Sequence, residues 1–125
     1  MFIRFTLLRL DVDSKRKTGI LVAADEFRDE GSLPIDEHRK LRRTLDWFNK
    51  NLPVPKDLNE DGNERALSWF KPSAKNAIKK AWALKALLDQ YDLHIEVHKT
   101  NDPGIVIYED EMQVVAKPRK GQKLS

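Results

Sequence analysis

The spacing of apolar residues switches between two patterns along this chain, and this switch limits the possible folds more than any other feature of the sequence. Leu41, Leu45 and Phe48 recur at intervals of four and three, so they share one face of an expected helix. Residues 93–99 instead alternate between apolar and polar, which is typical of a strand that is buried on one side. A chain that contains both patterns is expected to form an α+β domain.

The two patterns predict the element order strand, helix, helix, strand, helix, strand, strand, strand. Thr18 is expected to cap the first helix and Gly31 to end it, because Thr binds free backbone N–H groups and Gly adopts left-handed conformations. The expected strands cover residues 2–10, 66–71, 93–99, 105–108 and 112–116, and the second and third helices cover residues 33–51 and 72–90.

The expected sheet is mixed, has about five strands, and is covered by three helices. The long helix joins the strands near residues 69 and 93 over the length of a crossover, so these two strands are expected to run parallel. The last three strands follow one another through short turns and are expected to pair as a meander.

The composition fits one compact domain. Of the 125 residues, 40% are hydrophobic and 34% are charged, so the chain has the apolar material for a single core and a heavily charged exterior. Residues 1–117 are expected to form the domain and residues 118–125 a flexible basic tail. The absence of cysteine excludes disulfides and thiolate metal sites and fits a reducing compartment.

Neither a signal peptide nor a membrane span is expected. Arg4 and Arg9 interrupt the apolar N-terminal segment, and no stretch approaches the roughly 18 apolar residues that a spanning helix needs. We therefore expect a cytoplasmic protein, either a monomer or a small homo-oligomer, that does not contact membranes.

Charges of opposite sign are separated along the second half of the chain. Residues 65–88 hold six basic residues and no acid, residues 89–111 hold seven acids and one lysine, and residues 112–125 hold four basic residues and no acid. The two signs therefore belong to different secondary elements, which predicts oriented surface fields although the net charge is only +3.

Two tryptophans lie among cations rather than on the apolar faces of their helices. On a helical projection Trp82 falls close to Lys79, and Trp47 falls between Lys40 and Arg43. The candidate binding surface comprises Arg39, Lys40, Arg43, Trp47, Lys50, Lys75, Lys79, Trp82 and Lys85.

This surface allows three interpretations. Trp and Arg are favoured at the centres of protein interfaces, which makes a small non-enzymatic binding or adaptor protein our leading hypothesis. An indole that stacks on a base while cations meet phosphates would instead bind nucleic acid, preferentially single strands. The third interpretation is structural, with each indole packed beneath a loop or under lysine stems. In the nucleic-acid hypothesis the tail would add Lys117, Arg119, Lys120 and Lys123.

A metal-assisted hydrolase is a further alternative. His94, Glu96 and His98 line one face of an expected strand, so a neighbouring pair of them is a candidate metal ligand set. Asp102 and the acids at positions 109–111 add carboxylates. A solvated strand face and a polar hairpin turn are the simpler explanations of these two groups, and we favour them. The sequence contains no phosphate-binding loop, nucleophile elbow or zinc-spaced cluster, so we lean against an enzyme and expect no cofactor.

Three segments carry a resemblance to other proteins. They are the WFNxNLPVP pattern of residues 47–55, the WFKP pattern of residues 69–72 and the DPGxxxYEDExQVVA pattern of residues 102–116. Together they resemble a set of short uncharacterised bacterial proteins over most of the chain. The resemblance implies a single domain and supplies no catalytic residues.

Overall fold

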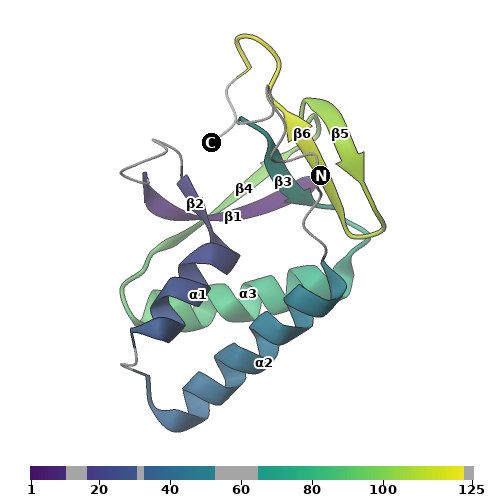
Figure 1. The fold of residues 1–125 in the computed structure, drawn as a ribbon. Helices are drawn as coiled ribbons and strands as arrows, with labels where there is room; N and C mark the ends of the chain where they lie inside the picture. The colour runs from purple at the N-terminus through teal and green to yellow at the C-terminus, as the bar shows by residue number, and fades with distance from the viewer. Residues whose placement is uncertain (11–16, 31–32, 53–64, 123–125) are drawn as a thin grey trace.

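A computed structural model of the chain describes residues 1–10, 17–30, 33–52 and 65–122. These residues form an α+β domain with the expected order of major elements (Figure 1). The elements are β1 (Phe2–Leu10), β2 (Lys17–Gly19), α1 (Ile20–Asp29), α2 (Ile35–Asn51), β3 (Leu67–Phe70), α3 (Lys75–Gln90), β4 (Ile95–Thr100), β5 (Ile105–Glu109) and β6 (Gln113–Lys117).

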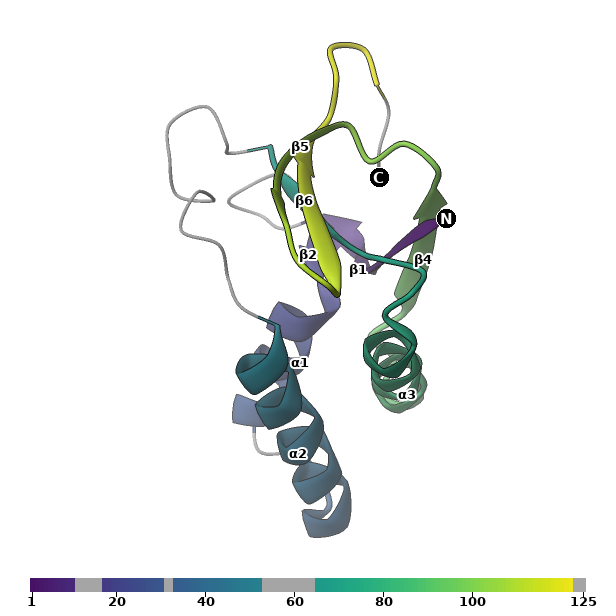
Figure 2. The same cartoon turned by 90° about the vertical axis from the view of Figure 1, so that its right-hand side faces the viewer.

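The elements form three layers. In Figure 1 the sheet lies above α1 and α3, and α2 lies below them, farthest from the sheet. Both α1 and α3 contact β1, while α2 contacts α1 and α3. Figure 2, turned by 90°, shows α3 nearly end-on and α2 as a separate helix, both below the sheet. The outer helix therefore packs on other helices and leaves much of its own surface free for contacts.

The sheet is antiparallel at every pairing between described strands, so the expectation of a mixed sheet was wrong in this detail. It has six strands, one more than expected, because residues 17–19 form the short strand β2. Strand β4 pairs with β1 along one edge, while β2 and β3 share the other edge of β1. Strands β6 and β5 follow β3 in the sheet.

The last three strands do not form one meander. Strands β5 and β6 pair as the expected hairpin, but β4 pairs with β1 at the other side of the sheet. Both β3 and β4 run antiparallel to β1, so they point in the same direction, as the crossover prediction required. They are not neighbours, because β1 lies between them.

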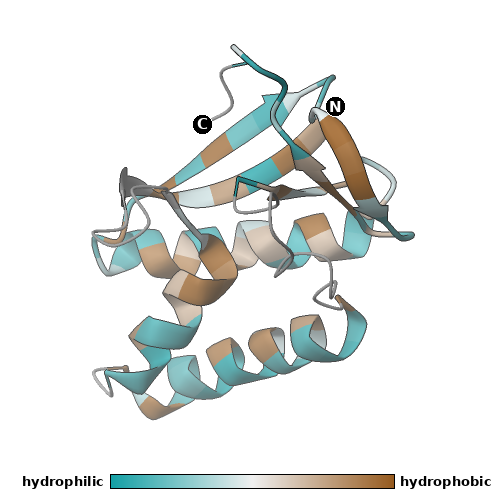
Figure 3. Ribbon diagram, turned by 45° about the horizontal axis from the view of Figure 1, so that its top comes forward, coloured by the Kyte–Doolittle hydropathy of each residue, from teal (hydrophilic) through white to brown (hydrophobic). Residues whose placement is uncertain are grey.

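The main core lies between the sheet and the helices. Cross-strand partners share a face of a sheet, and the paired residues Phe5 and Val97 point toward the helices. The α2 stripe predicted from the sequence is buried as expected, and Figure 3 shows its hydrophobic residues recurring between hydrophilic ones. Each fully buried leucine or phenylalanine contributes about 1.5–3 kcal/mol of transfer free energy.

The helix boundaries agree with the sequence except at the first helix. Helix α2 begins after Pro34 and ends at Asn51, close to the predicted bounds. Thr18 does not cap α1, because it lies in β2 and Gly19 occupies the N-cap position without a side-chain hydrogen bond. Gly31, the predicted end of that helix, lies outside the described residues.

Candidate binding surface

Trp82 is the exposed aromatic residue of α3. Its side chain remains 43% exposed, and its indole meets the ring of Phe5 edge to face at a centroid distance of 5.3 Å. Phe5 belongs to the buried core, so one side of the indole is anchored while the rest faces solvent. The ring is therefore held in a fixed position beside the core without being sealed inside it.

A cavity of about 660 Å³ opens beside this indole. We call it the Trp82 groove. Its cationic members are Lys75 and Lys79 of α3 and Lys99 of β4. Lys99 is the cross-strand partner of Ile3, which places both side chains on the helix side of the sheet, next to α3. The remaining lining residues are Met1, Ile3, Pro72, Ile78 and Trp82.

The Trp82 groove is positively charged. Its lining holds three lysines and no aspartate or glutamate. Within the described part of the chain, no carboxylate forms an ion pair with Lys75, Lys79 or Lys99. The combination of apolar walls and unneutralised ammonium groups fits a ligand that is both apolar and anionic.

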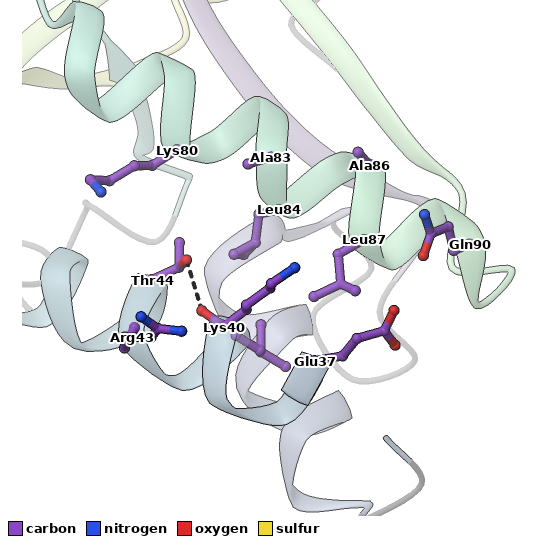
Figure 4. A pocket seen from close by; sticks show the side chains of 11 residues that line it. Glu37, Lys40, Arg43, Thr44, Lys80, Ala83, Leu84, Ala86, Leu87 and Gln90 are labelled. Atoms are coloured by element: carbon purple, nitrogen blue, oxygen red, sulfur yellow. Dashed lines mark hydrogen bonds between the residues drawn. The ribbon is translucent and has the colours of Figure 1, made fainter. Parts of the chain in front are cut away.

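A second groove lies between α2 and α3 (Figure 4). We call it the α2–α3 groove, and its volume is about 560 Å³. Leu84 and Leu87 of α3 point into it, and charged side chains of both helices flank it. The lining residues are Glu37, Lys40, Leu41, Arg43, Thr44, Lys80, Ala83, Leu84, Ala86, Leu87 and Gln90.

Trp47 lies beside the second groove and is half-buried rather than exposed. The ammonium group of Lys80 lies 5.1 Å from the centre of its ring, and the ring of Phe48 meets it edge to face. Lys80 thus covers the indole with a cation–π contact. The structural interpretation, an indole packed under a lysine, therefore applies to Trp47, whereas the exposed Trp82 can contact a ligand.

The two tryptophans do not share one groove. Trp82 lines the cavity between α3 and the β1–β4 strands, whereas Trp47 lies at the interface of α2 with α3. The lining sets of the two grooves have no residue in common. The residues that the sequence predicted as one candidate binding surface therefore belong to two cationic surfaces, which lie on the two sides of α3.

The other predicted surface residues divide by what they contact. Lys85 donates to the carboxylate of Asp89 at 2.6 Å and to the carbonyl of Ile95 at 2.8 Å, so it ties α3 to β4. Arg39 and Lys50 are exposed on α2 and line neither groove. Lys85 is therefore a structural cation, and the two α2 residues are peripheral.

The pKa of Asp89 reflects this structural role. Burial raises the pKa of the carboxyl group, but the backbone N–H of Ile95, 2.8 Å away, and the Lys85 ammonium lower it by more. The net shift is downward from the ordinary value of 3.8. Asp89 stays ionised near neutral pH and holds the start of β4 against the end of α3.

The candidate tail residues also differ in their surroundings. Lys117 ends β6, Arg119 forms an ion pair with Asp102, and Lys120 is exposed. The Arg119 guanidinium and the N–H of Gly104 hold the pKa of Asp102 below its ordinary value. Lys123 lies outside the described residues. The segment after β6 is thus connected to the turn before β5.

The three candidate metal ligands of the expected strand, His94, Glu96 and His98, are not brought together as one set. His94 lies before β4 with a φ of 39°, exposed to solvent, and within the described ranges no three His, Asp or Glu side chains are grouped to hold a metal. His98 Nε2 lies 2.9 Å from Thr6 Oγ1 and 3.9 Å from Glu96 Oε2. Both contacts are made by the same ring nitrogen of His98. A nucleophile–histidine–acid triad uses one ring nitrogen for each partner, and Thr6 is fully buried, so Thr6, His98 and Glu96 do not form such a triad.

The acidic block at residues 109–111 forms a hairpin turn. The Asp110 carboxylate accepts hydrogen bonds from the backbone N–H groups of Met112 and Gln113 at 2.8 and 3.0 Å and from the Tyr108 hydroxyl at 2.9 Å. Glu109 pairs with Lys71. Burial raises the pKa of Asp110, and these hydrogen bonds lower it by more, so the net shift is downward. The carboxylate of Asp110 thus stabilises the hairpin turn, as the turn interpretation of the acidic block predicts.

The sequence did not identify Lys80 and Lys99 as members of the two grooves. Lys80 follows Lys79 directly, but one helical step of 100° carries it to the α2 side of α3. Lys99 was counted only as an exception within the acidic region, and its position next to α3 depends on the pairing of β4 with β1. His38 is half-buried in α2.

Comparison with known protein families, with curated proteins and with solved structures gave no match. The resemblance to short bacterial proteins therefore stays an expectation. Within the described residues, no helix has both the length and the apolar character needed to cross a membrane.

Proposed function

We propose that this protein is a non-enzymatic binding protein that docks an acidic, partly apolar segment of a protein partner in the Trp82 groove. The observation that carries this proposal is an exposed indole beside three lysines that lack ion-pair partners among the described residues. Interface hot spots combine such aromatic anchors with a polar, solvent-accessible rim.

The apolar lining decides the chemistry of the ligand. Ile3, Ile78 and Pro72 offer no hydrogen-bonding side chains, so they suit an aliphatic or aromatic side chain of the partner better than the edge of a nucleobase. The lysines around them then attract carboxylates of the same segment. Truncation of a central tryptophan typically costs about 2 kcal/mol or more of binding free energy, which is about 30-fold in affinity.

Binding of single-stranded nucleic acid is the second candidate. The indole and the lysines of the Trp82 groove also suit a stacked base and its phosphates. Proteins that follow a single strand stack successive bases on several aromatic rings, and in the described residues Trp82 is the one aromatic side chain among the exposed large hydrophobics. This difference favours a protein segment.

The two candidates are separable with two fluorescent probes. One is a short fluorescein-labelled peptide of Glu, Leu and Phe residues, and the other is a labelled oligothymidylate of equal charge. We expect the peptide to bind, Trp82→Ala to weaken it about 30-fold, and a matched peptide with Lys in place of Glu to bind far less.

Salt dependence supplies the contrasting outcome. Nucleic-acid binding falls steeply with salt above about 50 mM because each phosphate contact releases counterions. Binding of the oligothymidylate with a steep salt slope, together with no binding of the acidic peptide, would replace the protein-segment proposal by the nucleic-acid one. Equal affinity of wild type and Trp82→Ala for both probes would remove both.

A further inference from the structure

The α2–α3 groove is the strongest surface that the Trp82 groove does not account for. Its base is apolar: Figure 4 shows Leu84 and Leu87 of α3 directed into the space between the helices. Leu84 is buried, as is Leu41 of α2, whereas Leu87 is half-buried and stays accessible. Ala83 and Ala86 are exposed on the same side of α3. Small side chains at these two positions leave room for another backbone to approach α3 closely.

The charges of the groove are distributed unevenly along its length. Arg43 of α2 and Lys80 of α3 lie toward one end and Glu37 and Gln90 toward the other, as Figure 4 shows, with Lys40 between them. The Glu37 carboxylate accepts a hydrogen bond from the Tyr91 hydroxyl. Its charge is therefore partly engaged within the protein, and the cations dominate the opening.

The cations of the groove are available to a ligand. In the described part of the chain, Lys40 and Arg43 form no ion pair, and Lys80 contacts the Trp47 ring instead of a carboxylate. The hydroxyl of Thr44 donates to the Lys40 carbonyl at 3.0 Å, so this polar group is already satisfied inside α2. The groove thus offers cations and apolar surface, and the Thr44 hydroxyl beside them is already occupied.

The walls determine the shape of the ligand. Both walls are helices, whose backbone groups are hydrogen-bonded internally and offer no open edge to an extended peptide. An incoming helix brings its own backbone hydrogen bonds and needs only side-chain contacts. A helix with an apolar stripe and carboxylates beside that stripe matches both the base and the cations.

We infer that the α2–α3 groove binds an acidic amphipathic α-helix of a protein partner. The helix lies along the groove with its apolar stripe on Ala83, Ala86 and Leu87 and with carboxylates next to Arg43 and Lys80. This inference does not depend on the Trp82 groove. With two separate grooves on the two sides of α3, the protein would have the two contact surfaces that an adaptor needs.

A synthetic helical peptide tests the inference. The probe is a fluorescein-labelled amphipathic peptide with Leu at helical spacing and Glu on both borders of the Leu stripe, and a scrambled peptide of the same composition serves as a control. The double variant Ala83→Gln, Ala86→Gln fills the groove with neutral side chains that keep high helix propensity. We expect this variant to weaken binding at least tenfold and Arg43→Glu to weaken it severalfold.

A matched variant separates the two grooves. Trp82→Ala is expected to change the affinity for the helical peptide less than twofold, because Trp82 does not line the α2–α3 groove. Backbone NMR shifts caused by the peptide are expected to cluster on Thr44, Ala83 and Leu87. Thermal unfolding of each variant, followed by circular dichroism, shows that the fold is retained.

Three outcomes would overturn the inference. One is equal binding of the peptide by wild type and by the folded groove-filling variant. Another is peptide-induced NMR shifts that cluster elsewhere than on α2 and α3. The third is a concentration-dependent dimer that the groove-filling variant dissociates, since the occupant would then be a second copy of this chain.

Discussion

Lys79 and Lys80 are adjacent in the sequence, yet they line different grooves on the two sides of α3. Charge reversal at each position therefore tests one groove at a time. We expect Lys79→Glu to weaken binding of the short peptide of Glu, Leu and Phe residues and to leave binding of the helical peptide unaffected. Lys80→Glu is expected to weaken binding of the helical peptide and to leave the short peptide unaffected. Rim charges affect association most, so stopped-flow association rates at low salt are the most sensitive measurement. Equal losses for both peptides in both variants would contradict the separation of the grooves.

Fluorescence quenching distinguishes the tryptophans. Trp82 is 43% exposed and Trp69 is 1% exposed, so acrylamide is expected to quench the first and hardly reach the second. The variant Trp82→Phe should therefore remove most of the quenchable fluorescence of the native protein. Trp47→Phe is the control, and it should remove a smaller share because Lys80 covers that ring. A native protein with no accessible tryptophan would contradict the proposed function.

Gly104 is required by the close packing of the turn before β5. Its φ is +110°, and an added Cβ would lie 2.2 Å from the Lys117 carbonyl oxygen. Gly104→Ala is expected to lower the free energy of unfolding by at least about 2 kcal/mol through backbone strain and this clash. Urea unfolding provides the measurement.

Two other glycines provide controls for that substitution. Gly121 has a φ of +82° but nothing within 4 Å of an added Cβ, so Gly121→Ala tests strain without the clash. Gly19 has an ordinary φ of −65° and open space around it, so Gly19→Ala is expected to be close to neutral. A Gly104→Ala variant as stable as Gly19→Ala would disprove the close contact with Lys117.

Asp110 is expected to make the hairpin sensitive to acid. Its pKa is lower in the folded protein than its ordinary value of 3.8, so its stabilising effect is complete above that value and is lost as the pH falls through the folded pKa. Asp110→Asn should lower stability at pH 7 and flatten the decline of stability between pH 4 and pH 2, measured by urea unfolding. Asp46→Asn, at an exposed position of α2, is the control. An equal acid response in wild type and Asp110→Asn would rule out this role.

The hydrogen bond between Tyr91 and Glu37 is expected to shift the ionisation of the tyrosine. The hydrogen bond to Glu37 raises the pKa of Tyr91 above its ordinary value of 10.0, so its stabilising effect is present below that pH and is lost as the pH rises through the folded pKa. In Glu37→Gln, the phenolate absorbance should appear at lower pH than in wild type. Tyr108, whose pKa is raised by its bond to Asp110, is the internal control and should be unchanged.

The sequence by itself determined the elements whose signals are local. Leu41, Leu45 and Phe48 specify the buried face of α2, and the turn residues between β5 and β6 specify the hairpin. The position of Trp82 outside the apolar stripe also follows from helical spacing alone, since spacing of three and four residues fixes the face of a helix. The failure at Thr18 has a local cause as well, because a short strand formed where a cap was expected.

Only the tertiary structure decided which elements lie together. Pairing of β4 with β1 brings Lys99 next to Ile3 and close to α3, although these residues are far apart in the sequence. The expected parallel pair is absent from the described sheet because β1 lies between β3 and β4, which run in the same direction but do not pair with each other. Strand pairing depends on contacts between distant segments and on how the intervening chain closes, and local periodicity carries no information about either. The two grooves are products of that pairing and of helix packing, so the sequence could supply some of their cations but neither Lys80 and Lys99 nor the separation of the grooves.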